Sequence, residues 1–345
     1  MEQPPPPKKK KTLVEAAVES AKTGSNAILE KIEELAEERK TQKVNVASIQ
    51  KRVKKLLKYT TFEPEQRYWL NTGSEELNAV LGSKDYGLPY GKIFELSGVE
   101  HGGKTLIGNV LMGMAQKDGA VAGYIDVEDS RDEMWSERLG VDWSSVVPVF
   151  AKLIQEGKNE DKLRLQSAEE LFDEAETVMK LNYQDGHKKQ FWLLDSIAML
   201  QTSSVIEAGA TDQNMRTKLD RAMFLSSILP RWSALAANYG AMIFLINQIR
   251  TNPGVLWGNP NYTPGGHALR HVCSIRAEVR RIKNGQLKQS GRIVGIVGKI
   301  KNEKNKAGQE SVQGAACGFK INWSTSPAKV EFSTVDDAED AIKTE

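Results

Sequence analysis

An eight-residue stretch rich in glycine, GVEHGGKT, fits the spacing G-x-x-x-x-G-K-S/T. In such a stretch the backbone N–H groups of a tight turn surround the oxygens of a bound phosphate chain. The lysine reaches the terminal phosphates, and the hydroxyl after it ligates Mg²⁺. An apolar run precedes the stretch and a helical pattern follows it, which is the context that the motif requires. We therefore predict a site for a nucleoside triphosphate and Mg²⁺, built on Gly98, Gly102, Gly103, Lys104 and Thr105.

Polar side chains follow the apolar runs that are expected to form strands around this loop. The runs are Lys92–Leu96, Val121–Ile125, Phe191–Leu194 and Met242–Ile246. In an open α/β sheet, ligands bind beyond the carboxyl ends of the strands. Hydrolysis of a triphosphate needs a carboxylate to activate water, a second to hold the metal, and a polar group to sense the γ-phosphate. Glu128, Asp195 and Gln248 follow three of the runs and suit these roles, although any one alone could make only a structural hydrogen bond.

Helical patterns alternate with these runs, as in a doubly wound, mostly parallel α/β sheet. The stretch Ser167–Leu181 begins with the residues of a capping box, and Leu219–Asn238 is a second helical stretch. Two shorter alternating segments follow, Ser274–Ile282 and Arg292–Ile300, joined through Asn284-Gly285. Because Asn-Gly favours a tight hairpin, these segments predict an antiparallel extension of the sheet.

The composition indicates one large core with a basic appendage. Of the 345 residues 40% are hydrophobic, and no run approaches the roughly 18 consecutive apolar residues that cross a bilayer. The start, MEQPPPPKKKK, lacks the apolar stretch of a secretory signal, so we expect a cytoplasmic protein with no membrane contact. Residues 1–60 carry 14 Lys/Arg against 8 Asp/Glu. This end is either a surface for nucleic acid or a partner, or a solvated tail.

Four segments are predicted along the chain. Residues 1–11 form a disordered tail rich in proline and lysine, and residues 12–65 form a helical arm whose apolar face packs on this subunit or on a neighbour. Residues 66–335 form the core, and residues 336–345 form a C-terminal tail. The two cysteines lack the spacing of a zinc site, so we expect both to be reduced and buried.

Several stretches of the core, between about Leu70 and Asn322, resemble the RecA-type recombinase family. They read LNTGSEELNAVLG, GLPYGKIFELSGVEHGGKT, YIDVEDSRDEMWSERLGVD, FWLLDS and FLINQIRTNPGVLWGNPNYTPGGHALRHVCSIRAEVRRI. The resemblance implies a RecA-like P-loop ATPase core that follows an N-terminal oligomerisation arm. It also implies a DNA-dependent ATPase that uses ATP and Mg²⁺. Such a protein forms a helical filament of its own copies on single-stranded DNA and exchanges strands with homologous double-stranded DNA, in a cytoplasmic, nucleoid-associated setting.

The resemblance also implies roles for single residues around the nucleotide. Glu128 is the implied catalytic base, and Gln248 is implied to couple the nucleotide state to a DNA-binding loop. Two lysines of the family reach the ATP of the next subunit, and Lys299 and Lys301 fit them best. A surface strand is the alternative for these two, and the lysine-rich run through Lys306 leaves the register open. Other positions implied to line the nucleotide are Glu100, Lys104, Asp132, Trp135, Asp195 and Ser196. Thr105 and Asp195 are implied to bind the metal. Ordinary packing is the alternative for Trp135.

The segment from Arg250 to Arg270 corresponds to the second DNA-binding loop of the family. It is rich in glycine and proline, so a mobile loop is expected. Its two consecutive glycines open a helix whose N–H groups suit a DNA phosphate. The first DNA-binding loop corresponds to about Ile206–Met215. The candidate DNA contacts are Arg216, Lys218, Arg221, Arg250, Gly265, Gly266 and His267, with a solvated helix face as the alternative for the first three.

The C-terminal part departs from the family pattern. Bacterial members carry a further domain there, whereas only Ser324–Glu345 follows the last matched strand. We therefore expect a divergent relative without that domain, for which a phage origin is one interpretation, and its handling of duplex DNA stands in question. A non-catalytic filament mediator and a hexameric helicase share the same core. Glu128 argues against the mediator, and the Gly/Pro-rich loop after Gln248 argues against the helicase.

Overall fold

The computed structural model describes residues 68–155, 163–208, 215–251, 261–307 and 314–343. The chain divides into two units, Met1–Glu63 and Pro64–Glu345, and all described residues belong to the second. The tail and the helical arm predicted for residues 1–65 therefore lie outside the described residues. So do residues 209–214 of the first candidate DNA-binding loop and residues 252–260 of the second.

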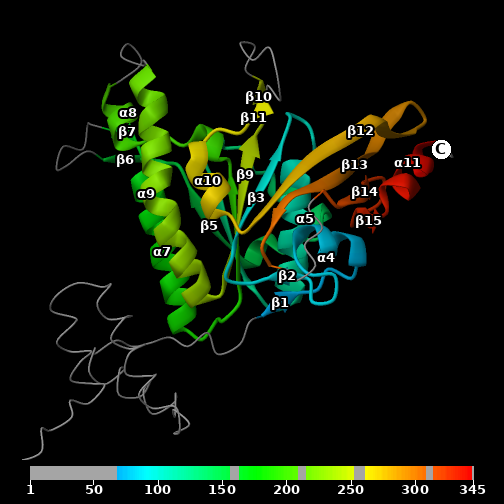
Figure 1. Ribbon diagram of the computed structural model, residues 1–345, viewed down its shortest axis with the longest axis horizontal. Helices are drawn as coiled ribbons and strands as arrows, with labels where there is room; N and C mark the ends of the chain where they lie inside the picture. The colour runs from blue at the N-terminus through cyan, green and yellow to red at the C-terminus, as the bar shows by residue number, and fades with distance from the viewer. Residues whose placement is uncertain (1–67, 156–162, 209–214, 252–260, 308–313, 344–345) are drawn as a thin grey trace, which may run out of the picture. The chain divides into compact units, whose positions relative to one another are not determined.

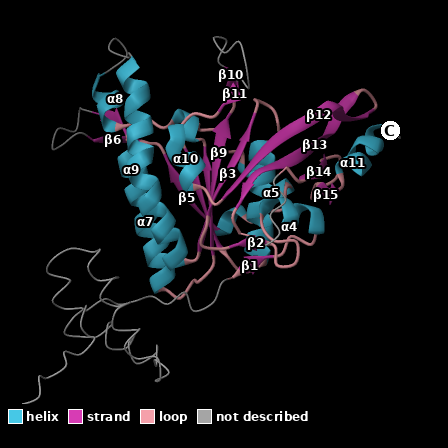
Figure 2. Ribbon diagram, viewed as in Figure 1, coloured by secondary structure: helices cyan, strands magenta, loops and turns pink. Residues whose placement is uncertain are grey.

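A nine-stranded sheet forms the centre of the second unit (Figure 1, Figure 2). Its strand order is β15-β14-β13-β12-β3-β9-β8-β4-β5. The six strands from β12 to β5 are parallel, and β12 to β15 pair antiparallel. This arrangement confirms the predicted doubly wound sheet with an antiparallel extension. The strands are β3 (Ile93–Gly98), β4 (Val121–Asp126), β5 (Val146–Phe150), β8 (Gln190–Asp195), β9 (Ala241–Gln248), β12 (Ile275–Gln289), β13 (Arg292–Asn305), β14 (Ala316–Asn322) and β15 (Lys329–Ser333).

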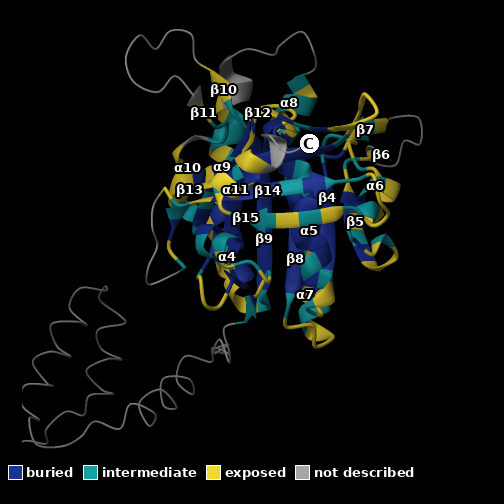
Figure 3. Ribbon diagram, turned by 90° about the vertical axis from the view of Figure 1, so that its right-hand side faces the viewer, coloured by how far each residue is buried: buried dark blue, intermediate teal, exposed yellow. Residues whose placement is uncertain are grey.

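Helices cover both faces of the parallel part of the sheet (Figure 1). Along β3, Phe94 joins an apolar cluster with residues of α4 and α5, whereas Ile93 joins a second cluster with residues of α7, α9 and α10. Strands that are buried on both faces read as continuous apolar runs, which explains why four of them were visible in the sequence (Figure 3). The helices are α4 (Glu75–Leu81), α5 (Lys104–Lys117), α6 (Glu133–Arg138), α7 (Ala168–Gln184), α8 (Ser203–Ala208), α9 (Met215–Tyr239), α10 (Gly266–Val272) and α11 (Val335–Lys343).

Local signals in the sequence correctly placed the start of α7. The Glu170 N–H donates to the Ser167 hydroxyl, and the Ser167 N–H donates to the Glu170 carboxylate at 2.9 Å, so the predicted capping box is present. Helix α9 contains Pro230 and ends before Gly240, whose φ is 65°. Three short two-stranded sheets complete the described strands. They are β1 (Trp69–Leu70) with β2 (Leu88–Pro89), β6 (Leu153–Gln155) with β7 (Leu163–Leu165), and β10 (Arg250–Thr251) with β11 (Asn261–Tyr262).

The predicted hairpin turn at Asn284-Gly285 is wrong. Strand β12 continues through these residues to Gln289, and the chain reverses at Ser290-Gly291, where both residues have positive φ. The pairing of β12 with β13 shifts register between Arg281 and Gln286, so Asn284-Gly285 lies in a β-bulge. Asn284 has a φ of 58°, and a Cβ on Gly285 would lie 2.3 Å from a backbone oxygen. The bulge thus requires the same residue types as a tight turn, which is why the sequence predicted a turn at this position.

The C-terminal segment differs from the predicted tail. Residues Val335–Lys343 form α11, which packs on β14. Ala338 of this helix is buried, and a Cβ on Gly318 of β14 would lie 2.5 Å from the Ala338 Cβ. A small residue on each element therefore lets them approach closely. The helix begins after Thr334, whose hydroxyl accepts from the Asp337 N–H.

The described residues include both cysteines and all of the helices named above. Cys273 and Cys317 are both buried and form no disulfide. None of the helices in the described part of the chain is long and apolar enough to span a lipid bilayer.

Candidate functional site

The glycine-rich stretch forms the turn between β3 and α5. Gly103 caps α5 in the left-handed conformation, with a φ of 98°. Gly98 ends β3 so close to β12 that a Cβ there would lie 2.3 Å from the Val279 carbonyl oxygen. A hollow of about 290 Å³ lies at this turn and is lined by His101 to Leu106 and by Ile296. The turn therefore presents backbone N–H groups at the N-terminus of a 14-residue helix, which suits a phosphate chain.

Lys104 lies in the turn rather than in open solvent. Its side chain is largely buried, and Nζ donates to the Val99 carbonyl at 2.8 Å. Burial lowers the pKa of Lys104, while the carboxylates of Asp195, Glu128 and Glu100 raise it. Such a partly desolvated cation gains a strong counter-charge when phosphate oxygens approach. Glu100 itself is largely exposed, 3.9 Å from the His101 ring nitrogen, and the structure does not bring it into contact with the other candidates.

Two oxygen ligands for a metal meet at the start of α5. The Thr105 hydroxyl donates to the Asp195 carboxylate at 2.7 Å, across the space between α5 and the end of β8. Among the described residues no group of three His, Cys, Asp or Glu side chains could enclose a metal. Mg²⁺ needs no such cage, because it binds through one or two protein oxygens together with phosphates and water. Thr105 and Asp195 therefore fit the predicted metal role.

Tyr124 is a member of this site that sequence reasoning missed. Its hydroxyl donates to the Asp195 carboxylate at 3.4 Å. Burial, together with the carboxylates of Glu128 and Asp126, raises the pKa of the Asp195 carboxyl to about 6, although the Thr105 hydroxyl and the Lys104 cation lower it. Burial also raises the pKa of Tyr124, so the tyrosine stays a neutral donor. The signal in the sequence that could have identified Tyr124 was its hydroxyl, which lies inside the otherwise apolar run Val121–Ile125.

Glu128 lies at the point where three strands end. Its Oε1 accepts from the Ser196 hydroxyl after β8 and from Gln248 Nε2 of β9, at 3.2 Å for the amide. The predicted base and the predicted sensor are thus in direct contact. Two donors on one oxygen fix the orientation of the carboxylate at the edge of the sheet where the phosphates would lie.

Asp132 and Trp135 have structural contacts in α6. The Asp132 carboxylate caps the helix by accepting from the Trp135 N–H at 2.9 Å. The Trp135 ring packs edge-on against Trp323 at 5.3 Å, and the Arg138 guanidinium lies over it at 5.6 Å. Neither predicted adenine contact lines the hollow at the glycine-rich turn. Their role toward a nucleotide stays a prediction.

The candidate DNA contacts lie beyond the carboxyl ends of β8 and β9. Arg250 is exposed on β10, whereas Arg221 is half-buried and donates to the carbonyls of Leu200 and Ala198. Gly265 has a φ of 104° and precedes α10, with His267 exposed in its first turn. The predicted helix opening is therefore confirmed, and DNA contact stays a prediction. The side chains of Arg216 and Lys218 lie outside the described residues, although both positions belong to α9.

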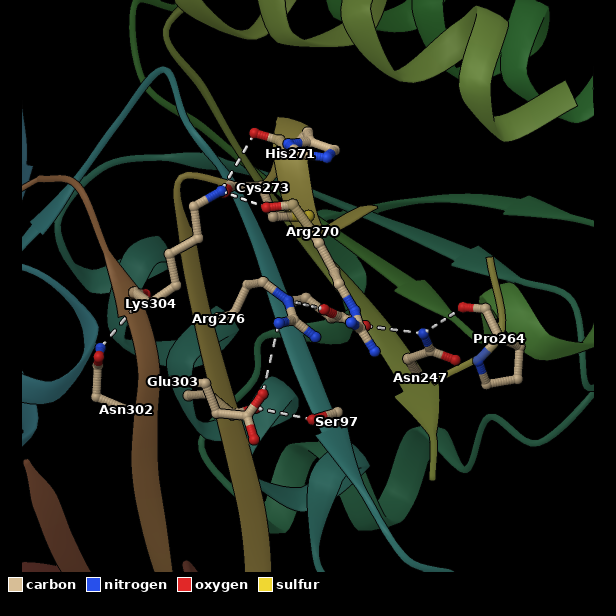
Figure 4. A network of polar contacts seen from close by, with 12 residues as sticks. Ser97, Asn247, Pro264, Arg270, His271, Cys273, Arg276, Asn302, Glu303 and Lys304 are labelled. Atoms are coloured by element: carbon tan, nitrogen blue, oxygen red, sulfur yellow. Dashed lines mark hydrogen bonds and ion pairs between the residues drawn. The ribbon is translucent and has the colours of Figure 1, made fainter. Parts of the chain in front are cut away.

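The lysines of β13 differ in their surroundings. Lys299 and Lys301 are two positions apart, opposite Arg280 and Glu278 of β12, and therefore share one face of the sheet. Lys301 is exposed and Lys299 is half-buried. Lys304 is engaged within the chain, because its Nζ donates to the carbonyls of Arg270, His271 and Cys273 at the end of α10 (Figure 4).

The sheet, the glycine-rich turn and the carboxylates at the strand ends together define a P-loop nucleotide-binding protein. Comparison with known proteins identifies the branch of this class. The family model of the RecA N-terminal domain matches residues 40–316, and the chain belongs to this family.

Individual relatives agree with the family match. The chain is 35% identical to Protein RecA of Lactobacillus acidophilus over 235 residues, which is 68% of this chain and 58% of the relative. It is 35% identical to Protein RecA of Rhodopirellula baltica over 237 residues, 69% of this chain and 56% of the relative. For Protein RecA of Thermus aquaticus the identity is 34% over 236 residues, 68% and 62% of the two chains. The chain thus matches less than two thirds of the length of these relatives.

Asp195→Asn is expected to stabilise the metal-free protein at neutral pH. Because the folded-state pKa lies above its ordinary value of 3.8, ionisation of Asp195 costs the folded state stability as pH rises through about 6. Removing that buried charge should raise the free energy of unfolding at pH 7 by up to about 3 kcal/mol, with little gain below pH 4. Urea denaturation in EDTA at both pH values measures this. Asp173→Asn, at an exposed position of α7, is the control, and an unchanged or lower stability of Asp195→Asn at pH 7 would contradict the expectation.

Proposed function

We propose that the chain is an ATP-dependent DNA recombinase that assembles on single-stranded DNA and pairs it with a homologous duplex. The observation that carries the proposal is the hydrogen bond between Gln248 and Glu128. Gln248 ends β9 and directly precedes the segment that leads to Gly265 and α10. A group that contacts the candidate base is therefore also the start of the candidate DNA-binding loop.

In the proposed reaction, Lys104 and the N–H groups of the glycine-rich turn bind the phosphates of ATP. Thr105 and Asp195 hold Mg²⁺, which neutralises charge on the phosphates when it is bound. Glu128 accepts a proton from the water that attacks the γ-phosphorus, and the bond to the bridging oxygen breaks to give ADP and phosphate. Ser196 and Gln248 hold Glu128 in position for this step. Glu100, Asp132 and Trp135 are proposed to complete the nucleotide contacts.

DNA is proposed to bind beyond the same edge of the sheet. Arg250 supplies an exposed cation, and the turn at Gly265, Gly266 and His267 supplies N–H groups. Arg216, Lys218 and Arg221 are proposed as phosphate contacts from α9. The protein would act on single- and double-stranded DNA in the cytoplasm, as a filament of its own copies.

The leading test is ATP hydrolysis with and without single-stranded DNA over a range of protein concentrations. If active sites are completed by assembly, the DNA-stimulated rate per subunit should rise cooperatively with protein concentration. Electron microscopy with a slowly hydrolysed ATP analogue should show helical filaments, whereas rings would indicate a motor. Strand-exchange assays separate a recombinase from a mediator. A monomer that hydrolyses ATP at full rate with DNA present would contradict the proposal.

A mixing experiment tests whether Lys299 and Lys301 act on the ATP of the next subunit. Glu128→Gln and Lys301→Ala should each be inactive alone. In an equimolar mixture, about a quarter of the interfaces would pair an intact glutamate with an intact lysine, so about a quarter of the wild-type rate should return. Lys306→Ala tests the neighbouring register, because it should be inactive alone and regain activity in the same mixture only if Lys306 acts across the interface. An active Lys301→Ala, no recovery in its mixture, or recovery only with an inactive Lys306→Ala would move the role away from Lys301.

A further inference from the structure

A buried polar cluster holds the far end of the segment between Gln248 and Gly265 (Figure 4). The Glu95 side chain of β3 is fully buried and pairs with Arg276 of β12 through Nε and Oε2 at 2.5 Å. The other Glu95 oxygen accepts from Asn247 Nδ2 of β9 at 2.9 Å. Asn247 Nδ2 also donates to the Pro264 carbonyl at 2.8 Å. The side-chain amide of Asn247 therefore joins the end of β9 to the residue just before Gly265.

The orientation of this amide is fixed by its partners. Nδ2 lies between a carboxylate and a carbonyl, which both accept hydrogen bonds, so exchanging the amide oxygen and nitrogen would place oxygen against oxygen. The Asn247 oxygen in turn accepts from the backbone N–H of Gln248 at 3.0 Å. Arg276 compensates the buried charge of Glu95 and also lies 3.6 Å from the Glu303 carboxylate of β13. Asn247 is thus oriented by its hydrogen bond to Glu95, whose negative charge is compensated by Arg276.

The near end of the same segment is held as well. The Ile249 N–H donates to the Gly98 carbonyl at 3.0 Å, at the start of the glycine-rich turn. Beyond Pro264, Lys304 donates a hydrogen bond to the Cys273 carbonyl at the C-terminal end of α10. A shift of Gln248 relative to Glu128 therefore moves the start of this segment. The last residue of the segment, Pro264, is hydrogen-bonded to Asn247, which directly precedes Gln248 in β9.

We infer that Asn247, oriented by the Glu95–Arg276 pair, is the positioning residue that transmits the state of Gln248 to Pro264 and the DNA-binding turn after it. The inference rests on the proposed function, because it explains how nucleotide and DNA binding at that site are coupled. Asn247 touches neither the phosphates nor the DNA in this role. Its loss should uncouple the two ligands while each still binds.

Asn247→Ala and the matched variant Gln190→Ala test the inference. Gln190 is also fully buried, and its Nε2 likewise donates to two acceptors, the carbonyls of Met179 and Tyr239, but at the opposite end of the sheet. Both variants lose a bridging amide of similar burial. The readout is the ratio of single-stranded DNA affinities with and without a slowly hydrolysed ATP analogue, measured by fluorescence anisotropy beside the melting temperature.

The inference expects Asn247→Ala to lower this coupling ratio at least about fivefold, and Gln190→Ala to change it less than about twofold. An equal effect of both variants would reduce Asn247 to a structural residue and overturn the inference. A wild-type ratio of one would instead refute the coupling in the proposed function, so the two failures are distinguishable.

Hydrogen exchange on the wild-type protein keeps the inference testable if Asn247→Ala does not fold. Adding the ATP analogue without DNA should change the exchange of peptides that contain Gly265 and the start of α10. Peptides that contain Gln190 serve as the internal reference. Unchanged exchange after Pro264, in a protein that binds the analogue, would overturn the inference.

Discussion

Glu128→Gln is expected to abolish ATP turnover, with a loss of at least about 10²-fold, because a neutral amide cannot accept the proton of the attacking water. The structure explains why the site should otherwise persist. Glu128 Oε1 accepts from Ser196 and from Gln248, and the amide oxygen of glutamine can accept both hydrogen bonds. Nucleotide binding and filament formation on DNA should therefore remain. Steady-state hydrolysis and DNA binding on the same preparation check this expectation.

The control for this substitution is Glu137→Gln, at an exposed position of α6. It changes the net charge by the same amount without touching the strand ends. Hydrolysis by Glu128→Gln within about threefold of the wild-type rate would remove Glu128 from the role of base. Loss of DNA binding in parallel with hydrolysis would show that the contact with Gln248 had been broken instead.

Lys104→Ala is expected to weaken nucleotide binding itself, by about 10- to 100-fold, because charge-assisted hydrogen bonds to phosphate contribute about 1.5–3 kcal/mol. Lys104 is the largely buried cation of the glycine-rich turn, and among the described residues its Nζ has one hydrogen-bond partner, the Val99 carbonyl. Burial lowers the pKa of Lys104, so the nucleotide-free protein should tolerate its removal. Titration with a fluorescent ATP analogue measures the loss directly.

Lys117→Ala, at the exposed opposite end of α5, is the matched control. Both substitutions remove one positive charge from the same helix, so a general electrostatic effect would appear in both. Unchanged affinity in Lys104→Ala, or an equal loss in Lys117→Ala, would contradict the assignment of the phosphate site. A lower melting temperature without nucleotide would indicate that Lys104 mainly stabilises the turn.

The sequence by itself determined the parallel strands and the phosphate loop. Four strands are buried on both faces, so each appears as an unbroken apolar run, and the glycine-rich stretch lies between a strand and a helix. The capping box of α7 was equally visible, since both of its partners lie within one turn. These features depend on neighbours in the chain, and local spacing is enough to specify them.

The local residue types gave a wrong prediction where two different structures require the same residues. Asn284-Gly285 suits a tight turn and a β-bulge alike, and only the pairing of β12 with β13 decides between them. In the C-terminal segment, α11 depends on packing against Gly318. Neither outcome is contained in the short segments themselves.

Contacts between distant positions were decided by the tertiary structure alone. The strand order places β4, β8 and β9 side by side, and this brings Ser196 and Gln248 onto Glu128 from positions 68 and 120 residues away in the chain. Tyr124 meets Asp195 for the same reason. The bond from Asn247 to Pro264 depends on how the chain returns to the sheet. Hydrogen bonds need a defined distance and direction, which sequence spacing does not specify once the chain leaves one element for another.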